Sequence, residues 1–515
     1  MNANTNQMTG IIDIGSNTVR LSVYQLTDNG AYRVVDQGRW AARLSQRMDK
    51  DGGLPEDVVD ELAEVLRHFS RICQKHGANH IRAVATAAIR QAVNRDDILR
   101  RLYTATGISI EILSGEDEAR IGSQAMLNSL SLSDCFVVDI GGGSTEITLI
   151  QNRKVVSAVS FPIGCVNTSA KYSLGNGAVP QSALTAIQSE VHRLLGIEKW
   201  ISRHPGLPLI GLGGTVRALA KLRQRESNYP FPHLHGYELT VPDLSSTLDR
   251  LAAIHVDQRR KLPGLSKDRG DVIVPGLAIL LGVLQRTATS RLVVCGTGLR
   301  DGLFYETCLP DNRRRSDSAD YVLEESIRNL SALYPVVPEV HLQQVHKLAL
   351  SLFDQLSPKQ SMPLGCRRWL ETAARLFRIG TVIDYNDSAD HTFYMLLHMQ
   401  WYGLSHREML LTGSIASYRG SNPLRRKLAP YRSMLAEGDV EIIAKLGSLL
   451  QLAAALDRSE SQAIKSLELS VKGNKLRLFA DADHPLPVER MEVDNIAKEF
   501  KKNWGITPEL NVRLR

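Results

Sequence analysis

The feature of this sequence that most limits its fold is an internal repeat. Residues 11–23 (IIDIGSNTVRLSV) and 136–150 (FVVDIGGGSTEITLI) share one pattern: an apolar strand, an aspartate, a glycine-containing turn with a hydroxyl residue, and a second strand. The two aspartates, Asp13 and Asp139, are 126 positions apart, which is about one domain length. The spacing predicts two similarly built domains that face each other.

The residues after the first turn separate it from the common nucleotide-binding motifs. Val19, Leu21 and Val23 alternate with other residues, so a strand follows the turn, whereas P-loops and Rossmann fingerprints need a helix there. A glycine turn exposes backbone N–H groups that can bind phosphate oxygens. Asp13 and Asp139, at the strand ends, can hold Mg²⁺ directly or through its waters. Each turn taken alone also fits an ordinary polar tight turn.

Two later glycine turns follow a different rule, because a helix comes after the glycines. Residues 207–222 predict a strand, a turn and a helix with Thr215 as its N-cap, and residues 293–305 form a similar unit that carries Arg300. A helix N-terminus favours anions through its free N–H groups and its dipole. The alternative is a tight strand-to-helix connection with no ligand.

Length and composition set the broad class. The chain has 515 residues, too many for one core, with 43% hydrophobic and 23% charged residues, as in soluble globular proteins. It has no apolar run of about 20 residues, which predicts no membrane span. Six scattered cysteines without a CxxC pair predict a reducing compartment, and we expect a cytoplasmic protein. The net charge of +7 suits an anionic partner, or is a solvated surface.

Changes in composition and in the helix and strand pattern along the chain predict its domain organisation. Strands and helices alternate up to about residue 306, and residues 312–318 are polar and basic, as in a linker. A helical pattern continues to about residue 457, and the last fifty residues predict a hairpin turning at Gly473-Asn474 and a helix over 493–504. We expect four domains, at residues 1–125, 126–310, 311–465 and 466–515.

Four motifs together carry a family resemblance. They are DIGSNT from Asp13, SGEDEAR from Ser114, DIGGGSTE from Asp139 and GGT from Gly213. In this order they resemble the exopolyphosphatase and guanosine pentaphosphate phosphohydrolase family over roughly residues 9–310. The resemblance implies an α/β fold of two ribonuclease-H-like domains of the actin, Hsp70 and sugar-kinase superfamily. The remainder resembles long members, which append an all-α HD-like domain and a small α+β C-terminal domain.

The resemblance also implies roles for individual residues. Glu118 corresponds to the catalytic carboxylate, which can orient and deprotonate water; the alternative is a surface residue in an acidic patch. The resemblance associates Asp139 and Glu146 with the cofactor Mg²⁺, and Asp13 joins them as a predicted ligand because of its strand-end position. The residues expected to contact phosphate are the glycines, hydroxyl residues and one arginine of the motifs: Gly15, Ser16, Asn17, Arg90, Gly141, Gly142, Gly143, Ser144, Gly213, Gly214 and Thr215.

The HD-like part departs from its metal-binding signature. His346 stands where the first histidine is expected, the His-Asp pair is replaced by Phe377-Arg378, and His391 remains downstream. Since phenylalanine cannot ligate a metal and arginine repels one, we predict no metal and no second hydrolase activity there. Candidates for a basic surface are the clusters at residues 367–368 and 425–427, with ordinary solvated charge as the alternative. His233 and His235 lack further ligands, which argues against a metal pair.

The leading hypothesis is a Mg²⁺-dependent exopolyphosphatase that releases terminal phosphate from inorganic polyphosphate, with conversion of guanosine pentaphosphate to the tetraphosphate left open as an additional activity. One alternative makes guanosine pentaphosphate hydrolysis the main activity. Another is an ATP-dependent small-molecule kinase of the same fold, and a third is a non-catalytic sensor of the alarmone or of a polyanion. Expected partners are polyphosphate, guanosine pentaphosphate and a second copy of the chain, with no membrane and no nucleic acid.

Overall fold

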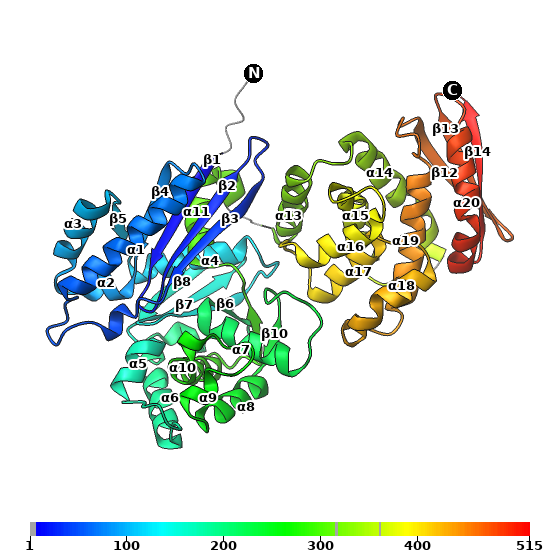
Figure 1. The fold of residues 1–515 in the computed structure, drawn as a ribbon. Coiled ribbons are helices and arrows are strands. Elements are labelled where there is room, and N and C mark those ends of the chain that lie inside the picture. Colours follow the sequence, from blue (N-terminus) through cyan, green and yellow to red (C-terminus); the bar gives the residue numbers. More distant parts are fainter. Residues whose placement is uncertain (1–6, 315–317, 360–361, 515) are drawn as a thin grey trace. The chain divides into compact units, whose positions relative to one another are not determined.

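Two β-sheets with the same strand order build the first part of the protein, seen here in a computed structural model (Figure 1). The first sheet has the order β3-β2-β1-β4-β5 and the second β8-β7-β6-β9-β11-β10. In each, three antiparallel strands are followed by two parallel ones, so the predicted repeat is confirmed in topology; the second sheet has one further edge strand, β10, which is antiparallel to β11. The strands are β1 (Gln7–Ile14), β2 (Val19–Leu26), β3 (Tyr32–Trp40), β4 (His80–Ala85), β5 (Ile110–Ile112), β6 (Cys135–Ile140), β7 (Thr145–Gln151), β8 (Lys154–Phe161), β9 (Leu209–Leu212), β10 (Glu238–Thr240) and β11 (Arg291–Val294).

Helices cover both sheets, with α1 to α3 beside the first and α5 to α10 around the second (Figure 1). In α1, Val58, Leu62 and Phe69 recur at helical spacing and are buried in the core of the first sheet. The helices are α1 (Glu56–Lys75), α2 (Ala87–Gln91), α3 (Arg95–Thr106), α4 (Gly115–Leu127), α5 (Cys165–Lys171), α6 (Gln181–Leu195), α7 (Gly213–Glu226), α8 (Val241–Ala252), α9 (Val256–Arg259), α10 (Ile273–Arg286), α11 (Leu299–Cys308) and α12 (Asp311–Arg314), with short 3₁₀ helices at Leu44–Gln46, Lys199–Ser202 and Lys267–Arg269.

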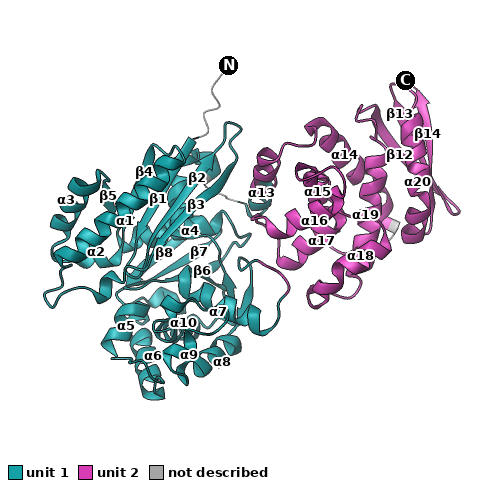
Figure 2. Cartoon of the chain, viewed as in Figure 1, with its two compact units in different colours: residues 1–229, 233–324 teal, residues 230–232, 325–515 magenta. Residues whose placement is uncertain are grey.

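The structure describes residues 7–314, 318–359 and 362–514. It divides into two units (Figure 2): unit 1 is Met1–Tyr229 with His233–Glu324, and unit 2 is Pro230–Pro232 with Glu325–Arg515. The predicted linker at 312–318 precedes this division, and its residues 315–317 lie outside the described residues. Both sheets belong to unit 1, where α4 and α11 share a small core with β1 through Ile11, Ile121 and Phe304.

Unit 2 is a helical array followed by a small three-stranded sheet. Its sheet has the order β12-β13-β14; β12 and β13 form the predicted hairpin, and β14 runs parallel to β13 after the crossover helix α20. The elements are α13 (Ala319–Leu333), whose first residues belong to unit 1, α14 (Glu339–Leu356), α15 (Cys366–Leu376), α16 (Ser388–His398), α17 (His406–Ala416), α18 (Ser421–Leu428), α19 (Asp439–Ala455), β12 (Ile464–Lys472), β13 (Lys475–Ala482), α20 (Pro487–Trp504) and β14 (Thr507–Leu514), with 3₁₀ helices at Ser357–Lys359, Ile379–Val382 and Ala429–Met434.

Two element boundaries differ from the sequence predictions. Helix α7 begins at Gly213, so Thr215 lies inside the first turn and is not the N-cap; its buried Oγ1 donates to the carbonyl oxygen of Ile140 at 3.5 Å. Glycine at position 213, with φ +75°, lets the chain enter the helix directly from β9. Helix α20 begins at Pro487, six residues before the predicted start, because proline is favourable in a first helical turn. Among the described residues, no helix has the length and apolar character that crossing a membrane requires.

Candidate phosphate-binding and catalytic site

The two repeated turns are built alike. A hydrogen bond from the Gly15 N–H to the Thr18 carbonyl oxygen (3.2 Å) closes the first, and one from the Gly141 N–H to the Ser144 carbonyl oxygen (2.9 Å) closes the second. A methyl group added to Gly142 would lie 2.9 Å from Cβ of Ser16. The turns therefore touch, and the prediction that they face each other is confirmed.

The carbonyl groups of the second turn are held from outside by helix α5. The carbonyl oxygens of Gly141 and Gly142 accept from the N–H groups of Cys165 and Val166 at 2.9 and 2.8 Å, and that of Gly143 accepts from the Asn167 side chain at 2.8 Å. In a trans peptide the N–H points opposite to the C=O. The N–H groups of residues 142–144 therefore point away from α5 as three successive donors, an arrangement that binds anions.

A cavity of about 130 Å³ in unit 1 lies at these turns. Most of the residues predicted from sequence line it, and three do not: Arg90, Glu146 and Thr215. The predicted residues in its lining come from both hairpins, α4 and the start of α7: Asp13, Gly15, Ser16, Asn17, Glu118, Asp139, Gly141, Gly142, Gly143, Ser144, Gly213 and Gly214.

Glu118 lies in the first turn of α4, where Ser114 caps the helix by accepting from the Asp117 N–H at 3.0 Å. Its side chain is 17% exposed, and its Oε2 accepts from Nη1 of Arg90 at 3.2 Å. The same Arg90 nitrogen donates to the Leu113 carbonyl oxygen at 2.8 Å. In this structure Arg90 therefore orients the Glu118 carboxylate, and its predicted contact with phosphate stays a prediction.

Four carboxyl groups share this part of unit 1. Burial raises the pKa of Glu118 well above its ordinary value, and the nearby Glu146 raises it further while Arg90 opposes the shift. Burial also raises the pKa of Asp139 to about 6 and that of Glu146 to about 7, the latter with help from Asp139. The pKa of Asp13 is likewise raised by burial. Negative charge is thus unfavourable here unless a cation is present.

Four arginines line the same cavity: Arg20, Arg217, Arg269 and Arg300. The sequence pointed only to Arg300, as part of an anion-favouring glycine turn, and to none of the other three. Burial, and next the charge of Arg217, lowers the pKa of Arg20 to about 9. Arg300 is anchored by donating from Nη1 to Ser22 Oγ at 2.6 Å, and the Arg269 guanidinium lies where a side chain on Gly214 would be. Planar guanidinium groups converging on one cavity are suited to phosphate oxygens.

The repeat itself contains a signal for one of these arginines. Asp13 pairs with Arg20 across β1 and β2, and Asp139 pairs with Glu146 across β6 and β7, so Arg20 and Glu146 occupy equivalent positions. One hairpin carries positive charge where the other carries negative charge. At this one position the first hairpin therefore favours an anion and the second favours a cation.

Within the described residues, no group of three or more His, Cys, Asp or Glu side chains is arranged to enclose a metal ion. Mg²⁺ does not need such a cage, because it keeps several waters and is commonly bound by one or two carboxylates together with substrate phosphates. Asp13, Asp139 and Glu146 supply only oxygen donors. Burial keeps their pKa values raised although nearby arginines oppose the shift, so this donor set fits a hydrated Mg²⁺.

The raised pKa values predict how stability depends on pH. Glu146 has an ordinary pKa of 4.5 and a folded-state pKa of about 7, so without metal its contribution is fully present below about pH 4.5 and is lost as pH rises to about 7. We therefore expect the melting temperature of the metal-free chain to fall more steeply over this interval than that of Glu146→Gln, which stays neutral. Differential scanning fluorimetry measures the melting temperatures of both proteins. Equal dependence on pH in the two would contradict the raised pKa of Glu146.

Other predicted histidines have ordinary structural roles. His235 Nδ1 accepts from the Gly296 N–H at 3.0 Å, and its Nε2 contacts the Ser129 carbonyl oxygen at 3.0 Å. His346 Nε2 lies 3.5 Å from a carboxylate oxygen of Glu371. His235 therefore has hydrogen-bond partners in unit 1, whereas the buried Nε2 of His346 has the ion-pair contact with Glu371 but no hydrogen bond among the described residues.

Comparisons with known proteins agree with this geometry. A model of the Ppx/GppA phosphatase family matches residues 22–310, and a model of domain III of the same family matches residues 322–499. A curated relative from Vibrio vulnificus, named guanosine-5'-triphosphate,3'-diphosphate pyrophosphatase, is 27% identical over 492 residues, which cover 94% of each chain. The resemblance seen in the motifs is thereby confirmed.

Solved structures match the first part of the chain. A Ppx/GppA family member from Aquifex aeolicus is 29% identical, with a TM-score of 0.51 over 59% of this chain and 99% of that one. A structure from Cytophaga hutchinsonii titled an exopolyphosphatase has a TM-score of 0.54 at 24% identity, over 58% of this chain and 97% of that one. The predicted α/β fold of the ribonuclease-H-like, actin-like kind is confirmed, and a helical region follows it.

Proposed function

The chain belongs to the Ppx/GppA phosphatase family, whose members hydrolyse phosphoanhydride bonds, and we propose that it releases the terminal phosphate of inorganic polyphosphate. The observation that carries this proposal is the cavity in which two facing glycine turns, four arginines and Glu118 meet. At about 130 Å³, it is below the usual size of pockets that enclose a whole organic ligand. A cavity of this size suits the terminal phosphate of a polyphosphate.

Each part of the cavity has a role in this proposal. The N–H groups of residues 142–144 bind oxygens of the terminal phosphoryl group, and the arginines offset the charge of that group and of the leaving phosphate. Glu118, oriented by Arg90, accepts a proton from the attacking water. The raised pKa of this buried carboxyl strengthens it as a base.

Asp13, Asp139 and Glu146 would hold Mg²⁺. When bound, the ion supplies charge neutralisation between these carboxylates and the phosphate oxygens. Ser160 Oγ donates to Glu146 Oε1 at 2.7 Å, which holds that carboxylate in place beside the second turn.

Guanosine pentaphosphate is the second candidate substrate. It is favoured by the name of the Vibrio vulnificus relative, which matches this chain over almost its whole length. Both substrates end in a phosphoanhydride, so one cavity that recognises the phosphate end accommodates either.

The test is a comparison of substrates. Purified full-length protein is incubated with long-chain polyphosphate, guanosine pentaphosphate or ATP, with and without Mg²⁺, and released phosphate is measured. We expect Mg²⁺-dependent release from the first two and little from ATP. No release from any substrate would support the sensor alternative, and phosphate transfer from ATP to an acceptor would support the kinase.

We also propose that α14 to α19 form a degenerate HD-like domain and that β12 to β14 with α20 form a small terminal domain. In support, His341 Nδ1 and Asp457 Oδ2 lie 2.7 Å apart, and the Phe377 ring is 5.7 Å from the His341 ring. These contacts favour His341, which is buried beside the Phe377-Arg378 replacement, as the first histidine of the degenerate signature in place of the predicted His346, which contacts Glu371.

The domain boundaries at residues 125, 310 and 465 belong to the same proposal. The first two separate the segments that form the two sheets, although α4 spans residue 125. Homodimerisation, a cytoplasmic location and the lack of nucleic-acid binding stay predictions.

A further inference from the structure

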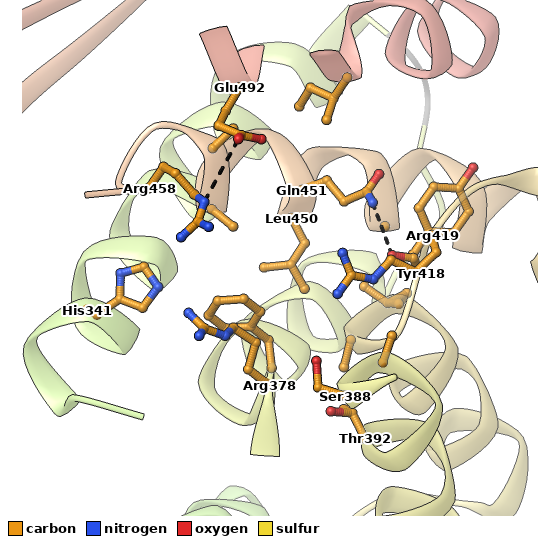
Figure 3. Close-up of a pocket in the computed structure, with 18 of the residues that line it drawn as sticks. His341, Arg378, Ser388, Thr392, Tyr418, Arg419, Leu450, Gln451, Arg458 and Glu492 are labelled. Atoms are coloured by element: carbon orange, nitrogen blue, oxygen red, sulfur yellow. Dashed lines mark hydrogen bonds and ion pairs between the residues drawn. The ribbon is translucent and has the colours of Figure 1, made fainter. Parts of the chain in front are cut away.

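A second and larger cavity lies within unit 2, and the proposed function does not use it. It has a volume of about 310 Å³ and is lined by residues from α14, α16, α17, α19 and α20 and from the connections between them (Figure 3). His341, Phe377 and Arg378 are in its wall, so it lies at the altered signature positions. Its size is at the lower end of the range for pockets that bind small organic molecules.

The wall carries an excess of positive charge. Arg378, Arg419 and Arg458 surround Leu450, whereas Glu492 is the one acidic residue in the described lining (Figure 3). The Arg458–Glu492 pair is long at 4.0 Å. In the described part of the chain, the Arg419 guanidinium has no hydrogen-bond or ion-pair partner. An anion entering the cavity would compensate this charge.

Arg378 is held in place by a constrained backbone. Its φ of 62° and ψ of 8° are left-handed, a conformation that costs a non-glycine residue on the order of 1 kcal/mol. The following chain is pinned to α16, since the Gly380 N–H donates to Thr392 Oγ1 at 3.0 Å and a side chain on Gly380 would lie 2.2 Å from the Thr392 nitrogen. Nη1 of Arg378 donates to Glu460 at 2.9 Å, which leaves its other nitrogens for a ligand.

The remaining surface suits the organic part of a ligand. Phe377, Ile415, Leu450 and Ala454 form an apolar floor. The side chain of Tyr385 lines the same cavity and is 66% exposed, so its ring is accessible for stacking. The cavity can therefore accept a single molecule that has an anionic group at the arginines and a flat ring system against Tyr385.

We propose that this cavity binds a small organic phosphate of nucleoside monophosphate size, with the phosphate on Arg378, Arg419 and Arg458 and the base against Tyr385. Guanidinium groups supply the positive charge at the position where the signature of this domain would place metal ligands. The proposal concerns binding alone and is independent of the function proposed for unit 1.

The test titrates full-length protein with AMP, inorganic phosphate or adenosine in a calorimeter. We expect AMP to bind more tightly than phosphate, and adenosine to bind more weakly than AMP. Arg419→Ala, which removes an unpaired and exposed arginine, should weaken AMP binding about tenfold, as expected for a hydrogen bond to a charged group. Tyr385→Ala should weaken binding of AMP but not of phosphate.

Two control variants distinguish AMP binding in this cavity from binding in the unit 1 cavity and from an effect of net positive charge. Arg425→Ala removes an exposed arginine of α18 that does not line the cavity, and Arg300→Ala alters the unit 1 cavity. AMP affinity should be unchanged in both. Unchanged affinity in Arg419→Ala, loss of AMP binding only in Arg300→Ala, or equal affinities for phosphate and AMP would overturn the proposal. A thermal melt of each variant confirms that it is folded.

Discussion

Replacing Glu118 by glutamine is expected to lower kcat for phosphate release about a thousandfold while leaving substrate affinity nearly unchanged. Glutamine has the same shape and can still accept the hydrogen bond from Arg90, but it cannot take a proton from water. General-base catalysis by one positioned group accounts for a rate effect of this order. The measurement is steady-state phosphate release together with binding of polyphosphate to the folded variant.

Glu116→Gln provides the matched control for this prediction. Glu116 is in the same turn of α4 but is exposed and does not line the cavity. We expect its kcat to equal that of the unaltered protein. If Glu118→Gln kept kcat within tenfold, or lost affinity while remaining folded, Glu118 would not be the catalytic base.

Replacing Arg269 by alanine is expected to lower kcat/KM about a hundredfold, the scale found when one preorganised donor to a developing charge is removed. Arg269 lines the cavity beside Gly214. Within the described residues its guanidinium has no hydrogen-bond or ion-pair partner, so the substitution breaks no hydrogen bond or ion pair of the fold. The effect should therefore appear in catalysis and not in the melting temperature.

Lys267→Ala is the control for Arg269. Lys267 lies in the same short 3₁₀ helix and is exposed, and it is not part of the cavity lining. Both variants lose one positive charge, so a difference between them reports position and not net charge. Equal kcat/KM values for the two variants would show that Arg269 does not contact the substrate.

The repeated hairpins could be predicted because their information is local. Alternating apolar residues after Asp13 and Asp139 require strands, and the glycines between them require turns. The repeat accounts for the pairing of β1 with β2 and of β6 with β7, whereas the parallel strands of both sheets lie outside it. The start of α7 was predicted wrongly, because Thr215 is a good N-cap by residue type. The positive φ of Gly213, which starts the helix earlier, depends on the packing of β9.

The arginines show what a sequence without tertiary contacts leaves out. Arg20 could have been found by aligning the two hairpins, because it occupies the position equivalent to that of Glu146. Arg269 has no such signal, since it is brought to Gly214 by the packing of a distant segment. The contact between His341 and Asp457 has no signal in the sequence for the same reason, because only the fold brings the two residues together.

The central claim is that the two facing turns hold the phosphate end of the substrate next to Glu118. Its most direct test is a crystal structure of Glu118→Gln with tripolyphosphate and Mg²⁺. We predict a terminal phosphate bonded to the N–H groups of residues 142–144, with Ser16 on its other side. A phosphate chain bound elsewhere, with the cavity between the turns holding only water, would contradict the claim.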